Sequence, residues 1–138
     1  MTITIRPATD ADLDETLALL AAAGLPTADV TIKELALAAE SGGELLGVIG
    51  LESFSDAALL RSLVVSEAAR GSGVGKALVS HLLAEARARS YSRLSLETGT
   101  MAGFAPARRL YQGLGFSICP PFGSYFVDPN SVCMTMTL

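Results

Sequence analysis

Short stretches of alternating or continuous apolar residues dominate the hydropathy pattern of the chain, and most are bounded by turn residues. Such stretches are typical of strands that are buried on one face or on both. Tight turns are indicated at Ser41-Gly42-Gly43-Glu44, at Ser55-Asp56 and at Asp128-Pro129-Asn130. The pattern predicts strands over Thr2–Arg6, Leu35–Ala39, Leu45–Ser53, Ala58–Val65, Arg93–Glu97, Ser117–Ile118 and Ser131–Leu138.

Apolar residues repeat every three or four positions in three other segments, which indicates amphipathic helices. The clearest case has Val74, Leu78, Leu82 and Ala86 at intervals of four. Another begins at Thr9, a residue type that caps helix N-termini, and acidic residues follow it. The predicted helices run from Thr9 to Gly24, over Val74–Arg89 and over Ala105–Leu114, with one ambiguous helical turn over Ala28–Lys33.

This order of elements places strands beside strands in the first half and alternates strands with helices in the second. It predicts the α/β (α+β) class, with a mixed sheet and helices on its faces. No internal repeat, low-complexity tract or linker interrupts the pattern, so we expect one domain over residues 1–138.

The composition narrows the class of partner. Half of the 138 residues are hydrophobic and 17% are charged, so the chain can bury a core. The formal net charge is -4 and no run of Lys or Arg exceeds two residues, which argues against nucleic-acid binding. No apolar run approaches the ~20 residues of a membrane span, and the N-terminus lacks the layout of a signal peptide. We therefore expect a cytoplasmic protein that does not enter membranes.

The two cysteines and the possible metal ligands are sparse. Cys119 and Cys133 are expected to be reduced thiols, because a domain with a full-sized core needs no disulfide framework. No cluster of His, Cys and Asp has the spacing of a metal site, so we expect no metal.

The glycine-rich turn Arg70-Gly71-Ser72-Gly73-Val74-Gly75 is the main candidate for a binding site. It lies between the most apolar predicted strand and the most regular predicted helix. The amides of a helix N-terminus bind anions, and glycine lets the backbone approach a phosphate closely. Arg70 and Lys76 add positive charge. This layout suits the capture of a pyrophosphate.

Two common phosphate motifs do not fit this turn. In a Walker A loop, Arg70 would occupy the first glycine position and Ala77 would replace the hydroxyl residue that binds Mg²⁺. In a dinucleotide fingerprint, Lys76 would replace the third glycine, and the turn would open the first βαβ unit rather than lie mid-chain. The pattern that remains is R-x-x-G-x-G after a strand.

That pattern, formed by Arg70, Gly73 and Gly75, resembles the hallmark of the GNAT superfamily of N-acetyltransferases. The segment Leu110-Tyr111-Gln112-Gly113-Leu114-Gly115-Phe116, about 40 residues later, looks like a second motif of that family. The order of elements is also the order of that family. The resemblance implies a GNAT fold, with a mostly antiparallel sheet of six or seven strands and helices on both faces.

The resemblance further implies that acetyl-CoA donates an acetyl group directly to a primary amine. The backbone near Leu63–Val65 would pair with the pantetheine arm like an extra strand, and the amides of Gly71–Lys76 would hold the pyrophosphate. Relatives often carry Asn where this chain has Phe104, and Thr98 is an alternative source of that contact. The residues that the resemblance places against acetyl-CoA are Leu63, Val64, Val65, Arg70, Gly71, Ser72, Gly73, Val74, Gly75, Lys76, Phe104, Ala107 and Tyr111.

The catalytic residues implied by the resemblance are Tyr111 and Glu97. Tyr111 matches the position of the family's general acid, and the alternative is a tyrosine that only packs on the sheet. Glu97 is the candidate base, directly or through an ordered water, and the alternative is a carboxylate that caps the Thr98–Gly99 turn. Glu52 is the other carboxylate expected near the cleft.

Arg61 interrupts an apolar strand, and a guanidinium in that setting requires an anionic partner. The partner is either a substrate carboxylate or one of Glu52 and Glu97. We therefore name Arg61 and Glu52 as candidate substrate-binding residues. The short segment between Pro26 and Leu35 predicts an open acceptor site or one completed by a second subunit.

The acceptor is expected to be a small molecule, on two partial resemblances. Segments such as Ala22-Ala23-Gly24-Leu25-Pro26-Thr27 are similar to acetyltransferases found with arsenic-resistance genes, which suggests an amino acid or a toxic amino-acid analogue. Segments from Leu94 onward, such as Ser95-Leu96-Glu97-Thr98-Gly99, are similar to another bacterial GNAT group. A peptide acceptor and a non-catalytic acyl-CoA sensor are the alternatives. Because relatives commonly form dimers, we expect a homodimer.

Overall fold

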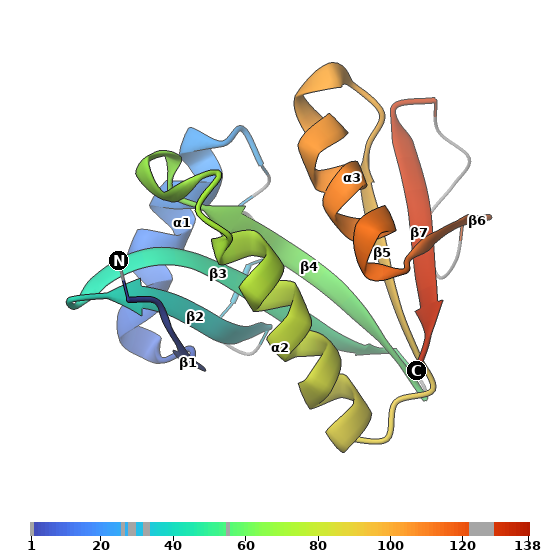
Figure 1. Ribbon diagram of the computed structural model, residues 1–138, viewed down its shortest axis with the longest axis horizontal. Helices are drawn as coiled ribbons and strands as arrows, with labels where there is room; N and C mark the ends of the chain where they lie inside the picture. Colours follow the sequence, from blue (N-terminus) through green and yellow to red (C-terminus); the bar gives the residue numbers. More distant parts are fainter. Residues whose placement is uncertain (1, 26, 28–29, 32–33, 55, 122–128) are drawn as a thin grey trace.

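The computed structural model describes residues 2–25, 27, 30–31, 34–54, 56–121 and 129–138 (Figure 1). The strands are β1 (Thr4–Pro7), β2 (Leu35–Ser41), β3 (Glu44–Phe54), β4 (Ala57–Val65), β5 (Arg93–Gly99), β6 (Ser117–Cys119) and β7 (Ser131–Thr137). The α-helices are α1 (Leu13–Ala22), α2 (Val74–Ala88) and α3 (Ala105–Leu114), and the 3-10 helices are η1 (Asp10–Asp12), η2 (Glu67–Ala69) and η3 (Ala102–Phe104).

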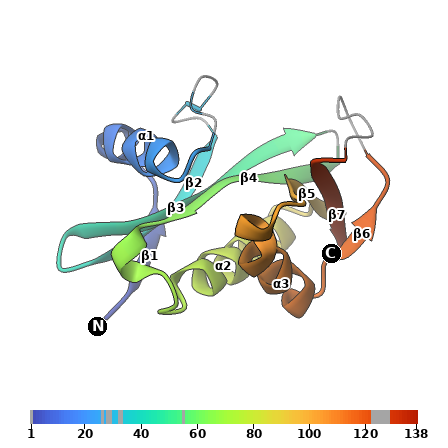
Figure 2. The same ribbon diagram turned by 90° about the horizontal axis from the view of Figure 1, so that it is seen from above.

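The seven strands form one mixed sheet in the order β1-β2-β3-β4-β5-β7-β6. The pairing of β4 with β5 is parallel, and every other neighbouring pair is antiparallel. Helix α1 covers one face of the sheet, and α2 and α3 cover the other (Figure 2). The predicted fold class, a mostly antiparallel mixed sheet with helices on both faces, is therefore confirmed.

Each face of the sheet has its own hydrophobic core. Under α2 and α3, leucines from α2 such as Leu78 and Leu82 pack against Leu94 and Leu96 of β5. Under α1, Leu20 packs against a separate cluster that includes Val48 and Val64. The part of the chain that the structure describes contains no helix long and apolar enough to cross a membrane.

Most predicted elements are found within one or two residues of their expected ends, and Ala105–Leu114 is found as predicted. The predicted N-terminal helix is split into η1 and α1, because the amide of Asp12 bonds to the Thr9 carbonyl three residues back and tightens the first turn. The helical turn expected over Ala28–Lys33 falls largely outside the described residues, and so do Ser55 and Asp128 of the predicted turns.

Asp12 joins the first strand to the first helix. Its two carboxylate oxygens each accept a 2.8 Å hydrogen bond from the guanidinium of Arg6 on β1, and one also accepts a 2.7 Å bond from the Thr9 amide. Glu40 of β2 forms a second ion pair with Arg6, at 3.2 Å. Asp12 is buried, and its hydrogen bonds to Arg6 lower its pKa to about 2.

We predict that Asp12→Asn lowers the free energy of unfolding by about 2 kcal/mol at pH 7. Because the folded-state pKa of Asp12 lies below its ordinary value of 3.8, the carboxylate stabilises the fold fully above that pH. Its contribution is lost as the pH falls through about 2. Urea unfolding of the wild type and the variant at several pH values measures the difference. The exposed neighbour Asp14, changed to Asn, is the control and is expected to change stability by less than about 0.5 kcal/mol.

Candidate active site

A break in the sheet opens the site. Strands β4 and β5 are paired only at Ala58 with Leu94 and at Leu59 with Ser95, and beyond these positions they diverge (Figure 1). Strand β4 also carries an extra residue relative to β3, because Gly50 opposes Arg61 while Val48 opposes Val64. Such a bulge bends a strand and increases its twist. The backbone of Leu63–Val65 therefore has no β5 partner.

The bulge depends on a left-handed backbone conformation at Ser62 and on Gly50, which lies opposite Arg61 in the facing strand β3. Ser62 has a φ of 58°, in the left-handed region that non-glycine residues rarely occupy. At Gly50, an added Cβ would lie 2.7 Å from the Glu34 carbonyl oxygen and 2.9 Å from the Arg61 carbonyl oxygen. Both neighbours are backbone atoms, so a side chain at position 50 would push the strands apart. The glycine allows the close approach that holds the bulge.

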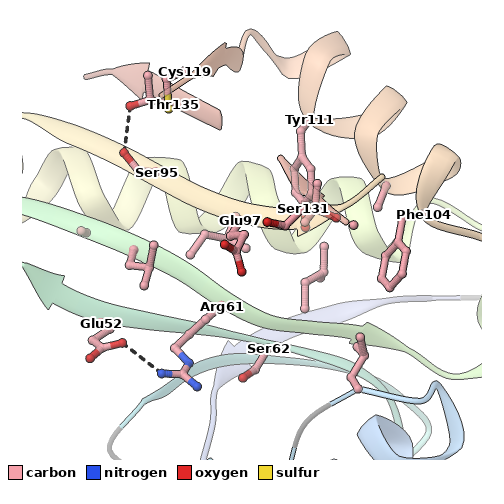
Figure 3. Close-up of a pocket in the computed structure, with 18 of the residues that line it drawn as sticks. Glu52, Arg61, Ser62, Ser95, Glu97, Phe104, Tyr111, Cys119, Ser131 and Thr135 are labelled. Carbon is pink, nitrogen blue, oxygen red and sulfur yellow. Dashed lines mark hydrogen bonds and ion pairs between the residues drawn. The ribbon is translucent and has the colours of Figure 1, made fainter. Parts of the chain in front are cut away.

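The diverging strands line a cavity of about 1090 Å³. Figure 3 shows Arg61 and Ser62 from β4, Glu97 from β5 and Tyr111 from α3 around it. The predicted site residues that line the cavity are Glu52, Arg61, Leu63, Glu97, Phe104, Ala107 and Tyr111. The structure therefore brings the candidate catalytic and substrate-binding residues into one space.

The glycine-rich turn lies at the end of β4, outside that cavity lining. Gly71 and Gly73 have φ values of 79° and 90°, and Gly73 is the N-cap of α2. The first turn of α2 has no acidic residue, so its positive end is not neutralised locally. Arg70 reaches back along the turn and donates a 3.4 Å hydrogen bond to the Val65 carbonyl. The helix N-terminus and the nearby cations Arg70 and Lys76 form a site suited to a phosphate group, and the Ser72 amide is already donated to the Ala69 carbonyl.

Tyr111 belongs both to the hydrophobic core and to the cavity. It is 5% exposed, and its ring contacts the edge of Phe116 at a centroid distance of 5.7 Å. Burial raises the pKa of its hydroxyl well above the ordinary value of 10. Tyr111 therefore packs in the core and also lines the cavity, and its hydroxyl keeps its proton at neutral pH.

Arg61 is paired with carboxylates of the protein. Its Nη1 lies 3.0 Å from Glu52 Oε2, and its Nε lies 3.4 Å from Glu34 Oε2. Glu52 was predicted as one possible partner, whereas Glu34 was missed. Glu34 reaches the site because its carbonyl accepts a 2.7 Å hydrogen bond from the Leu51 amide on β3. The sequence gives no local sign of that long-range contact.

The start of α3 is fixed by Phe104 and Arg108. The Phe104 ring packs so closely on Gly99 that an added Cβ at position 99 would lie 2.4 Å from it. Arg108 donates hydrogen bonds of 2.6 Å and 3.1 Å to the carbonyls of Gly99 and Met101. Arg108 was not among the predicted site residues. It ties the end of β5 to α3 and thereby sets where Tyr111 meets the cavity.

The family model described as acetyltransferase (GNAT) family matches residues 7–116, which is most of the chain. The chain belongs to the GNAT family. It is 49% identical over 79 residues to the uncharacterised N-acetyltransferase YsnE of Bacillus subtilis, covering 57% of this chain and 52% of that protein. It is 38% identical over 98 residues to YedL of Escherichia coli, an uncharacterised N-acetyltransferase, and the match covers 70% of this chain and 62% of that protein. The chain thus spans about half to three fifths of these relatives.

A solved structure from Klebsiella pneumoniae, assigned as an acyl-CoA N-acyltransferase, has the same fold. The two sequences are 30% identical, and the superposition has a TM-score of 0.81. It covers 99% of this chain and 97% of the Klebsiella chain. The predicted GNAT fold and family are therefore confirmed over nearly the whole chain.

We predict that Gly73→Ala weakens binding of acetyl-CoA about tenfold. A non-glycine residue in the left-handed region costs about 1–2 kcal/mol, and relief of that strain would move the amides that face the phosphate site. Isothermal titration with acetyl-CoA measures the change. Gly42→Ala is the matched control, since Gly42 also has a positive φ (58°) but lies in the β2–β3 turn. Equal binding by the Gly73 variant and the wild type would contradict the prediction.

Proposed function

We propose that this chain is an acetyl-CoA-dependent N-acetyltransferase that transfers acetyl directly to a primary amine of a small molecule. One arrangement carries the proposal: the glycine-rich turn caps α2 beside the end of β4, and the backbone of Leu63–Val65, which has no β5 partner, leads from it toward the cavity. Family membership and the acyl-CoA N-acyltransferase of similar sequence support the choice of donor.

The chain's own residues fit such a donor. The amides of Gly71–Lys76 would hold the pyrophosphate, and the free edge of β4 would pair with the amide groups of the pantetheine arm. Bound there, acetyl-CoA supplies the activated acetyl group. Thr98, Phe104 and Ala107 line the cavity on the side of β5 and α3 and would close around the thioester end. No group of three or more potential metal ligands occurs among the described residues.

Proton transfer would involve Tyr111 and Glu97. The Tyr111 hydroxyl stays protonated, so it can donate a hydrogen bond to the sulfur that leaves as a thiolate. Its raised pKa favours donation of a hydrogen bond over full transfer of the proton. Glu97 is exposed to the cavity and would accept the proton of the amine, directly or through a water molecule.

The proposed acceptor is a small molecule that carries a primary amine. The resemblance to arsenic-resistance acetyltransferases suggests an amino acid or a toxic amino-acid analogue, whose carboxylate would reach Arg61 by exchanging with Glu34 or Glu52. Release of free CoA thiol with a panel of amines tests the activity. Binding of acetyl-CoA without thiol release would instead indicate a sensor, and release only with peptides would indicate a peptide acetyltransferase. We also propose a cytoplasmic homodimer.

We predict that Tyr111→Phe lowers kcat about 10- to 100-fold, because the leaving thiolate loses its hydrogen-bond donor. The dissociation constant for acetyl-CoA is expected to change less than threefold, since the ring and its contact with Phe116 remain. Turnover assays and titration calorimetry measure the two quantities. An unchanged kcat would remove Tyr111 from the mechanism.

We predict that Glu97→Gln lowers kcat about 10- to 100-fold with an ordinary alkylamine, which is protonated at pH 7. An acceptor that is already neutral at pH 7, such as trifluoroethylamine, does not need a base and should lose much less. The ratio of the two losses distinguishes a base from a residue that only supports the Thr98–Gly99 turn. Equal losses with both amines would show that Glu97 has a structural role.

A further inference from the structure

The two cysteines of the chain face each other across neighbouring strands. Cys119 is the last residue of β6, and it lies directly opposite Cys133 on β7. Their positions in the sequence give no sign of this pairing, because the register of the two strands decides it. Both residues are thiols in this structure.

Both side chains lie on the face of the sheet that lines the cavity. Residues directly opposite each other in an antiparallel pair share a face. Cys119 lines the cavity, and so does Glu97, which pairs with Cys133 from the other side of β7. Met134, the next residue of β7, belongs instead to the core beneath α2 and α3. The two thiols and Glu97 therefore form one row across β6, β7 and β5.

The spacing of the two cysteines suits a covalent bond. On the same face, Ser95 of β5 lies opposite Thr135 of β7, and their hydroxyl oxygens are 2.8 Å apart (Figure 3). The register of β6 on β7 runs without a shift from Ser117 to Cys119. Opposed residues in an antiparallel pair have Cα atoms about 4.5 or 5.5 Å apart. Both values lie within the roughly 4.4–6.8 Å that separates the Cα atoms of a disulfide.

The remaining adjustment is small and falls on the edge of the sheet. Opposed Cβ atoms lie about 4.5–5.5 Å apart, whereas a disulfide needs about 3.5–4.5 Å. In the described part of the sheet, β6 is an edge strand of three residues. Cys119 ends that strand, so it can approach Cys133 by about 1 Å while the two earlier pairs stay in place.

We propose that Cys119 and Cys133 form a reversible intramolecular disulfide in the wall of the cavity. The oxidant is a small-molecule disulfide such as oxidised glutathione. The Cys119 thiolate attacks one sulfur of that molecule and releases the first small thiol. The Cys133 thiolate then attacks the Cys119 sulfur and releases the second. Two protons and two electrons thereby pass from the cysteines to the two small thiols.

Exposure assigns different roles to the two thiols. Cys119 is partly exposed and can be reached through the cavity, whereas Cys133 is 4% exposed. Burial raises the pKa of the Cys119 thiol and the charge of Arg93 lowers it in part, so only a small fraction is thiolate at neutral pH. We expect oxidation to take minutes to hours. The pair would therefore respond to sustained oxidising conditions.

The disulfide would change the acceptor end of the cavity and leave the phosphate end as it is. Cys133 lies beside Glu97, the proposed base, and Pro120 after Cys119 also lines the cavity. Drawing the two cysteines together moves both parts of the wall. The glycine-rich turn lies outside the cavity lining, at the end of β4. This consequence, unlike the disulfide itself, rests on the proposed acetyltransferase activity.

Incubation of the whole protein with excess oxidised glutathione, followed by intact-mass measurement without reductant, tests the bond. The wild type is expected to lose two hydrogen atoms and both titratable thiols, and dithiothreitol should restore them. Cys133→Ser should stop at a mixed disulfide that adds one glutathione. Cys119→Ser should react at least about tenfold more slowly than the Cys133 variant, because its remaining thiol is buried.

The wild-type result decides the proposal without the variants. A stable glutathione adduct on wild-type Cys119, a disulfide-linked dimer, or two unchanged thiols would each overturn it, because each shows that Cys133 does not reach the Cys119 sulfur.

The effect on the acceptor site is measured after removal of the oxidant. Initial rates are used, since released CoA thiol can itself reduce the bond. The oxidised wild type is expected to have a kcat/KM for the amine about threefold or more below that of the reduced form, because the wall beside Glu97 has moved. The dissociation constant of acetyl-CoA should change less than about twofold. Cys119→Ser, given the same treatment, should keep the efficiency that it had before.

Equal efficiencies of oxidised and reduced wild type would overturn the effect on the acceptor site. Absence of thiol release by both forms would overturn the proposed activity, and the mass measurement would still decide whether the disulfide forms.

Discussion

The site depends on one constraint, the extra residue that β4 carries opposite β3. A strand that pairs regularly on both sides would leave no space between β4 and β5. The bulge at Ser62 turns β4 away from β5 after two paired positions, and Gly50 provides the room on the other side. The cavity-lining residues Glu97, Ala107 and Tyr111 come from β5 and α3 on the other side of the resulting gap. Because β4 lacks a β5 partner beyond Leu59, its backbone amides and carbonyls on that side are available to a ligand that carries amide groups of its own.

The stabilising core and the proposed chemistry share residues. Tyr111 packs against Phe116 and lines the cavity, so its ring needs no reorganisation when a ligand arrives. Arg108 fixes the end of β5 to the first turns of α3 and places Tyr111 indirectly. Arg61 also has a double role, since it lines the cavity while its guanidinium pairs with Glu34 and Glu52. Local order at the site therefore comes from contacts that also hold the fold.

Features encoded by neighbouring residues could be predicted from the sequence. The helix Ala105–Leu114 has its expected bounds because Gly115 takes the left-handed conformation that ends a helix. The glycine-rich turn was located from its own residues, and in the structure Gly71 and Gly73 adopt positive φ values that suit a tight turn before a helix. Long-range register was not predictable. The strand Ala58–Val65 looks regular in the sequence, and only its pairing with β3 reveals the bulge.

The same limit explains what was missed in the site. Glu34 and Arg61 are far apart in the sequence, and they meet because the Glu34 carbonyl bonds to the amide of Leu51. Arg108 gave no signal, because its partners are backbone carbonyls that any residue type provides. Roles that depend on backbone partners or strand register require the three-dimensional arrangement. The roles of Tyr111 and Glu97 remain predictions that rest on the motif and on their place in the cavity.

The two-residue ladder between β4 and β5 has a mechanical consequence. Among the described residues, it joins β5, β7 and β6 to the rest of the sheet at Ala58 and Leu59, next to a hydrogen bond from the Ser92 amide to the Asp56 carbonyl. The packing of α2 across both parts adds to this connection. The buried cluster beneath α2 contains residues of both parts, such as Leu60 of β4 and Leu94 of β5. The width of the gap is therefore set by side-chain packing on the opposite face of the sheet and hardly at all by backbone hydrogen bonds between β4 and β5.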